Sequence, residues 1–190
     1  MKRFFGYAIL IALVLAFALP TYAQTDIGFK GIGARLGYVM PEDPIDNTIG
    51  FGVQADLGTI IPEIHVGALI EYWKKSYDVG SASWSWSEFV IAPTAKYYFP
   101  VQSEFKPYGG AGIGLSIGKW SEKYDYAYFG QQEYSASDTK LGIFFMGGAE
   151  YKFNPNVTGF AELKYHMDGA DYFGIFVGAT YYFSLSSASN

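Results

Sequence analysis

The chain lacks cysteine entirely, so neither disulfide bonds nor thiolate metal sites are available to it. It also lacks an excess of basic residues. Removing Lys2 and Arg3 from the 13 basic residues leaves 11 against 18 acidic ones, a formal charge of −7. This balance argues against a nucleic-acid partner. Finally, a membrane-spanning helix requires about 20 apolar residues, and no apolar run in this chain is that long.

The longest apolar run lies at the N-terminus, where the 16 residues from Phe4 to Leu19 follow Lys2 and Arg3. This run is too short to cross a bilayer core of about 30 Å. Small residues up to Ala23 then match the site that a signal peptidase reads. We therefore predict a cleaved signal peptide over residues 1–23 and one mature domain over residues 24–190. An exported chain without disulfides must gain its stability elsewhere, and closing a sheet is one way.

Glycine and aromatic residues are abundant, with 23 Gly, 17 Tyr and 16 Phe. The pattern Ala-x-Tyr-x-Phe occurs three times, at residues 95–99, 149–153 and 179–183. Each copy closes a run of alternating apolar and polar residues, which is typical of a strand whose faces meet different surroundings. Such aromatics would form a ring between hydrocarbon and water, because a Tyr ring is apolar with a polar tip. The predicted girdle consists of Tyr97, Phe99, Tyr151, Phe153, Tyr181 and Phe183.

Eight alternating segments follow the predicted signal peptide, and most match the about 9–11 residues of a tilted membrane strand plus some overhang. They cover residues 28–40, 49–58, 64–74, 84–99, 108–119, 139–153, 157–167 and 172–183. Barrels of this kind have longer outer loops and short periplasmic turns. The outer loops are expected at residues 41–48, 76–83 and 120–138, and the turns at residues 58–63, 100–107 and 154–156.

Large apolar side chains and charges fall on opposite faces of these segments. Ile49, Phe51 and Val53, for example, alternate with glycines and with Gln54 and Asp56. The charges share a face with glycine, which suits a crowded interior, whereas a lipid-facing Arg or Lys at mid-membrane costs about 2–4 kcal/mol. We therefore predict an all-β fold: an eight-stranded antiparallel up-and-down transmembrane β-barrel, apolar outside and polar inside.

Three stretches carry a family resemblance: residues 33–38 (GARLGY), 151–156 (YKFNPN) and 181–183 (YYF). With them the mature chain resembles the small outer-membrane barrels of the OmpA and OmpX type. The resemblance implies a Gram-negative outer membrane with lipopolysaccharide around the barrel. It also implies insertion by the barrel-assembly machinery, which would read Tyr181 and Phe183. Because residues 184–190 follow, the alternative that these two are only girdle residues stays open.

Twelve inward polar residues are expected to form a network in the lumen. They are Arg35, Gln54, Asp56, His65, Glu71, Glu88, Lys96, Glu150, Lys152, Glu162, Lys164 and His166. Their four basic and five acidic side chains suggest mutual pairing, because an unpaired buried charge is very costly. An eight-stranded barrel is just wide enough for side chains to fill it. A polar plug in place of a hydrophobic core is therefore favoured over the alternative, a narrow pore for small solutes.

An enzyme would need a nucleophile, a base and an orienting group within reach of one another. Some relatives of this type modify lipid A, but His166 has no serine close by on its own strand. We expect no catalytic residue, no cofactor and no metal. A metal bound by histidine with Asp and Glu is the alternative to simple pairing of His65 and His166 with carboxylates.

Aromatic residues also concentrate in the expected outer loops, and Tyr and Trp dominate binding hot spots. The candidates for binding a surface ligand are Trp84, Trp86, Trp120, Tyr124, Tyr126 and Tyr128. The alternative is a second girdle with strand extensions above the membrane. The sequence thus favours a non-enzymatic barrel with a structural or surface-interaction role.

Overall fold

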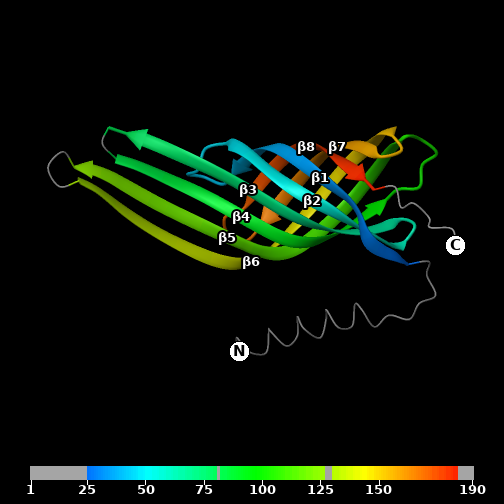
Figure 1. Cartoon of the computed structure of the whole chain (residues 1–190). Coiled ribbons are helices and arrows are strands. Elements are labelled where there is room, and N and C mark those ends of the chain that lie inside the picture. Colours follow the sequence, from blue (N-terminus) through cyan, green and yellow to red (C-terminus); the bar gives the residue numbers. More distant parts are fainter. Residues whose placement is uncertain (1–24, 81, 127–129, 184–190) are drawn as a thin grey trace, which may run out of the picture.

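The computed structural model describes residues 25–80, 82–126 and 130–183. Within these ranges eight strands pair in chain order and close into a ring (Figure 1). They are β1 (Asp26–Pro41), β2 (Thr48–Ile61), β3 (Ile64–Val79), β4 (Ala82–Tyr98), β5 (Phe105–Tyr126), β6 (Gly130–Asn154), β7 (Val157–Met167) and β8 (Tyr172–Tyr182). Every neighbouring pair is antiparallel. The predicted up-and-down barrel is confirmed, while the predicted signal peptide, residues 1–23, lies outside the described residues.

None of the described ranges contains a helix with the length and hydropathy needed to cross a membrane.

Strands β3 to β6 extend beyond the other strands at one end (Figure 1). β5 has 22 residues and β6 has 25, against 11 in each of β7 and β8. We call this the hairpin end, with connectors at residues 42–47, 80–81, 127–129 and 168–171. The opposite, terminal end carries the connectors at residues 62–63, 99–104 and 155–156, together with both ends of the described chain.

The loops expected at residues 76–83 and 120–138 are therefore largely strand, and that expectation was wrong. Their polar composition suggested loops, but their backbones continue the ladders, as the register pairs Ser76 with Ser85 and Ser121 with Ser135 shows. Stacking of Tyr77 on Trp84, with ring centroids 3.9 Å apart, supports the β3–β4 hairpin from one side. The two ends thus differ in strand extension more than in loop length.

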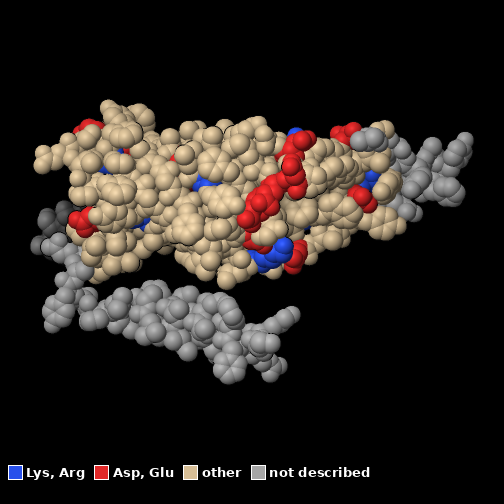
Figure 2. Space-filling model, turned by 180° about the vertical axis from the view of Figure 1, so that it is seen from behind, with Lys and Arg blue, Asp and Glu red and all other residues tan. Residues whose placement is uncertain are grey.

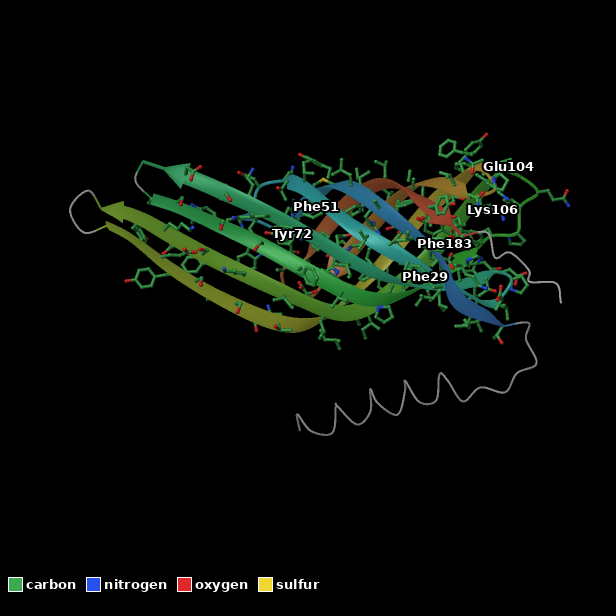
Figure 3. All side chains as sticks on the ribbon, viewed as in Figure 1. Phe29, Phe51, Tyr72, Glu104, Lys106 and Phe183 are labelled. Atoms are coloured by element: carbon green, nitrogen blue, oxygen red, sulfur yellow. The ribbon has the colours of Figure 1, made fainter. Side chains whose placement is uncertain are left out.

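Apolar side chains cover the outside of the barrel, as predicted. Phe51 is 57% exposed and Val177 is 54% exposed. Phe51 lies beside Tyr72 on the outer wall, with centroids 5.6 Å apart (Figure 3). From behind, a broad surface with few charged residues separates small acidic groups near one end from a larger acidic group toward the other (Figure 2). The apolar face has the form of a lipid-facing belt.

This belt ends along one row across β3 to β5. Tyr72, Phe89 and Ile117 are register partners on the outward face. The next outward row toward the hairpin end is Lys74, Ser87, Lys119 and Ser137, and the following row is Ser76, Ser85, Ser121 and Ser135. Since lipid-facing positions must be apolar, the switch to Lys and Ser marks the edge of the belt.

Glycines make room inside the barrel, also as predicted. Gly37 is the register partner of Phe176, and a Cβ atom on Gly37 would lie 2.2 Å from that ring. The same arrangement joins Gly112 to Phe144. The interior is therefore not purely polar, because bulky apolar residues share the inward face with the charges. One buried apolar cluster contains Val39, Trp73, Tyr172 and Phe176, and a second contains Leu69, Val90, Ala92, Tyr98, Tyr108, Phe144 and Met146.

Candidate functional site

Four buried charges form the centre of the interior. Arg35 Nη2 donates to Glu162 Oε1 at 2.6 Å, and Arg35 Nε lies 3.4 Å from Glu71 Oε2. Lys164 Nζ donates to Glu71 Oε1 at 2.6 Å. All four side chains are at most 1% exposed. Glu71 belongs to β3 and Lys164 to β7, which stand four strands apart in the ring, so the network crosses the full lumen.

Tyrosine hydroxyls and a further lysine extend this network. Tyr108 donates to Glu162 at 2.7 Å, and Tyr98 donates to Glu150 at 2.6 Å. Lys96 Nζ lies 3.7 Å from Glu150 and 3.8 Å from Glu162. The carboxylates are thereby paired or hydrogen-bonded, which offsets the cost of removing them from water.

Aromatic faces surround the interior cations. The Arg35 guanidinium lies 4.1 Å from the ring centroid of Phe176, and Lys164 Nζ lies 4.7 Å from that of Phe144. A cation within about 6 Å of a ring centroid is attracted by the ring quadrupole. The apolar residues of the interior therefore stabilise its charges as well as filling space.

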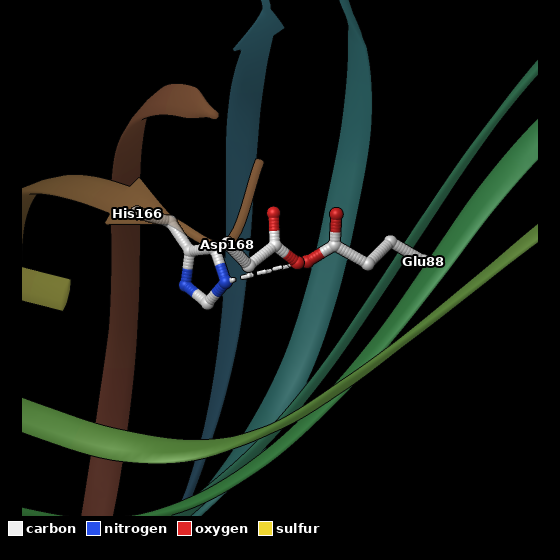
Figure 4. Close-up of side chains that lie close together, drawn as sticks. All are labelled: Glu88, His166 and Asp168. Atoms are coloured by element: carbon white, nitrogen blue, oxygen red, sulfur yellow. Dashed lines mark ion pairs between the residues drawn. The ribbon is translucent and has the colours of Figure 1, made fainter. Parts of the chain in front are cut away.

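A second polar group lies between this network and the hairpin end (Figure 4). His166 Nε2 lies 2.9 Å from Ser116 Oγ, 3.6 Å from Glu88 Oε1 and 3.6 Å from Asp168 Oδ2. The His166 ring is stacked on Tyr172, with centroids 4.8 Å apart. The side chains of Glu88, His166 and Asp168 are 1%, 1% and 5% exposed. Three buried atoms of this group have no hydrogen-bond partner among the described residues: both carboxylate oxygens of Glu88 and Nδ1 of His166.

Asp168 belongs to the β7–β8 connector and remains charged in this setting. Burial of its carboxylate disfavours the charge, but the neighbouring His166 ring and the Ala170 N–H, which donates at 2.8 Å, outweigh it and lower the pKa of Asp168 to about 2. Trp86, Glu88, Ser116, Trp120 and Asp168 border a cavity of about 190 Å³. The polar group therefore adjoins a cavity toward the hairpin end.

The proximity of Ser116 to His166 does not amount to a hydrolytic triad. In such a triad the base takes the serine proton with one ring nitrogen while the acid holds the other. Here Ser116 and both carboxylates approach the same nitrogen, Nε2. Ser116 is also 1% exposed and faces the lumen rather than lipid.

At the terminal end the expected network is looser. Gln54 donates to Thr180 at 3.0 Å, and His65 lies 3.4 Å from Asp56. Lys152 differs from the expectation, because its side chain is exposed rather than buried in the network. It borders a cavity of about 240 Å³ at the rim, since β6 continues past the level of the buried charges. Glu104 and Lys106 border the same cavity and lie at this end (Figure 3).

The aromatic binding candidates lie on strands rather than in loops. Register places Lys75, Trp86 and Trp120 in one row, and Tyr77, Trp84 and Glu122 in the next row toward the hairpin tips. This face continues the lumen side, opposite the serine rows, and all three tryptophans are half-buried. Tyr124 is half-buried on the same strand face as Trp120, and the backbone of Tyr126 ends β5. Tyr128 lies outside the described residues.

All six predicted girdle residues are exposed at the terminal end. Each pair packs edge to face, with centroid distances of 5.4 Å for Tyr97–Phe99, 5.2 Å for Tyr151–Phe153 and 5.7 Å for Tyr181–Phe183. Phe29 of β1 packs against Phe183, with ring centroids 5.2 Å apart (Figure 3).

Sequence reasoning missed several partners of the interior charges, namely Tyr98, Tyr108, Ser116, Asp168 and Tyr172. Alternation within each strand could have identified Tyr98 and Tyr172 as inward, because Tyr98 shares parity with Lys96 and Tyr172 has the parity opposite to the outward girdle residue Tyr181. Asp168 carries no such signal, since it belongs to a connector.

Comparisons with known proteins agree with this architecture. The chain matches the family model described as outer membrane protein beta-barrel domain over residues 9–183. No curated protein matches the chain in sequence. Among solved structures, Neisserial surface protein A is 21% identical, with a TM-score of 0.60 over 80% of this chain and 96% of that chain.

Two further solved structures share the fold. Ail of Yersinia pestis, solved with the heparin analogue sucrose octasulfate, is 17% identical, with a TM-score of 0.54 over 82% of this chain and 97% of that one. OprG of Pseudomonas aeruginosa is 14% identical, with a TM-score of 0.55 over 85% of this chain and 99% of that chain. Together with the closed ring and the apolar outer belt, the match shows that the chain belongs to the outer membrane protein beta-barrel domain family and is a protein of the outer membrane.

Proposed function

We propose that this protein is a non-enzymatic outer-membrane barrel with a closed lumen, which contacts surface ligands through its extended hairpins. The observation that supports closure is the ion-pair network from Arg35 through Glu71 to Lys164. It joins opposite walls of the barrel, and its side chains are buried. Ions would have to break these pairs to pass, at a cost of several kcal/mol for each charge left unpaired.

Planar-bilayer recording tests the closed lumen. We expect no stable openings with the purified protein. Replacing both Lys164 and Glu71 by alanine removes a pair without leaving one charge alone, and should produce openings. The matched control replaces Lys123 and Glu133, an exposed pair 3.3 Å apart on the hairpin extension. Stable openings of the unaltered protein would refute closure and favour a narrow pore, a reading supported by the cavities of about 190 and 240 Å³ at the two ends.

The hairpin extension supports a role in surface binding. Its outward rows of Ser and Lys indicate a sheet that lies in water beyond the apolar belt. Tryptophans on a sheet that lies in water do not add to the stability of a lipid-facing belt. The face opposite the Ser and Lys rows nevertheless carries Trp84, Trp86 and Trp120. Aromatic residues of this kind are over-represented among binding hot spots. The residues that interact with a ligand would therefore lie on one face of the sheet.

Binding can be measured with the protein in lipid nanodiscs on arrays of host-matrix proteins and glycans. Heparin belongs on the array because Ail was crystallised with a heparin analogue. Replacing Trp84 and Trp120 by serine should abolish the signal. Replacing Ser85 and Ser121 by alanine, on the other face of the same strands, should leave it unchanged. An empty array, or equal loss in both variants, would contradict this role.

The surroundings of the barrel follow from the same proposal. Lipid and lipopolysaccharide would contact the apolar belt, and the barrel-assembly machinery would insert the chain. The exposed pair Tyr181 and Phe183 at the end of β8 supports this last step, because it is available to a partner at the terminal end.

A further inference from the structure

We propose that Glu88, His166 and Asp168 bind a divalent first-row transition-metal ion at the hairpin end of the lumen. One ligand atom from each of the three lies within 4.8 Å of the other two. Each residue comes from a different element: β4, β7 and the β7–β8 connector. The proposal goes beyond the closed lumen and the surface-binding hairpins, and it stands independently of both.

The spacing suits coordination. Ligands about 2.1 Å from a tetrahedral zinc ion lie about 3.4 Å from one another. His166 Nε2 lies 3.6 Å from Glu88 Oε1 and 3.6 Å from Asp168 Oδ2. Both carboxylates therefore lie within a few tenths of an ångström of the coordination spacing from the imidazole nitrogen, and the ligand atoms of all three residues lie within 4.8 Å of one another. The close-up shows the two carboxylates and the ring directed toward the same point (Figure 4).

The buried carboxylate of Glu88 is the second observation that points to a cation. Its side chain is 1% exposed, and neither oxygen accepts a hydrogen bond from any described residue. A buried carboxyl group is normally hydrogen-bonded, or it coordinates a metal. The buried Lys164 donates to Glu71 at 2.6 Å and makes no hydrogen bond to Glu88. A metal ion would give the Glu88 oxygens a partner and would also bind the neighbouring carboxylate of Asp168.

The chemistry of the ligands indicates the class of ion. One imidazole with two carboxylates suits Zn²⁺, Fe²⁺ or Mn²⁺, whereas the set has no thiolate for a soft ion. Coordination would replace the 2.9 Å contact between His166 Nε2 and Ser116. The cavity bordered by Glu88, Ser116 and Asp168 gives the ion a route from the hairpin end. The bound ion would tie β4 to the β7–β8 connector across the lumen.

The test uses full-length protein without a polyhistidine tag, purified from outer membranes in detergent and stripped with a chelator. Calorimetric titration should show one saturable Zn²⁺ per chain. His166→Gln and Asp168→Asn should weaken binding by more than about tenfold. The matched control is His65→Gln, which alters the other histidine near the terminal end and should bind as the unaltered protein does.

Electron paramagnetic resonance of the Cu²⁺- or Co²⁺-loaded protein identifies the ligand directly. In His65→Gln, His166 is the remaining imidazole of the chain, because the sequence has two histidines. Imidazole nitrogen coupling in that sample is expected. This measurement shows whether His166 is a ligand even if the His166→Gln variant fails to fold. The heat-dependent gel shift would reveal such a failure. Absence of saturable binding, loss of nitrogen coupling in His65→Gln, or equal binding in all variants would overturn the proposal.

Discussion

Lys164 and Glu71 form an ion pair of 2.6 Å inside the barrel, and neither side chain has any solvent exposure. The same Glu71 oxygen accepts a hydrogen bond from Tyr172 at 2.7 Å. The pair joins β7 to β3 across the ring, so it holds two walls that share no backbone hydrogen bonds.

Replacing Lys164 by methionine should lower the free energy of unfolding by about 3–5 kcal/mol, because Glu71 would keep a buried charge with one fewer partner. Urea unfolding in detergent micelles, followed by tryptophan fluorescence, measures this change. The control is Lys123→Met, whose exposed partner Glu133 lies 3.3 Å away, and it should change the free energy of unfolding far less because water screens the pair. Similar losses in the two variants would mean that burial of the Lys164 pair contributes little.

Gly112→Ala should destabilise the barrel, because the added Cβ would lie 2.2 Å from the ring of Phe144. Overpacking of this kind costs about 1–3 kcal/mol. Combining it with Phe144→Leu should return part of the loss, since the smaller side chain leaves room. Gly109→Ala on the same strand is the matched control, because nothing lies within 4 Å of its new Cβ. Equal urea midpoints for Gly112→Ala and Gly109→Ala would contradict the packing argument.

The absence of cysteine makes the edge of the apolar belt directly measurable. Single cysteines at Leu115 and Ile143, which face outward, should report lipid when carrying a spin label. Labels at Ser85 and Ser137, on the outward face of the extension, should report water. Relaxation by oxygen, compared with relaxation by a water-soluble nickel chelate, separates the two environments. Water access at Leu115, or lipid at Ser85, would place the boundary elsewhere.

Phe183→Ala distinguishes recognition by the assembly machinery from simple girdle packing. If the machinery reads this residue, the variant should accumulate less in the outer membrane yet refold normally into lipid vesicles. Phe153→Ala, which removes a more exposed girdle aromatic from β6, should leave both measurements near normal. The heat-dependent gel shift reports the folded fraction in each setting. Equal losses for the two variants in both settings would support the girdle interpretation alone.

Several features could be predicted because they depend on alternation within one strand. Phe51 and Val177 face outward, and Glu71 and Lys164 face inward, as the period of two requires. Lys152 follows the same alternation, but it is exposed, because parity gives the face of a residue and not its depth. Trp120 was recognised as a candidate, although the polar composition after it predicted a loop where β5 and β6 continue as strands.

The sequence by itself determined the class of fold, the number of strands and the lipid-facing side, because a strand between lipid and a crowded interior must alternate at every second residue. The tertiary structure alone decided which interior groups meet. Arg35 contacts Glu162, 127 residues away, and Ser116 contacts His166, 50 residues away. Such contacts depend on the register of several ladders at once, and on where the connector brings Asp168, so no local pattern encodes them.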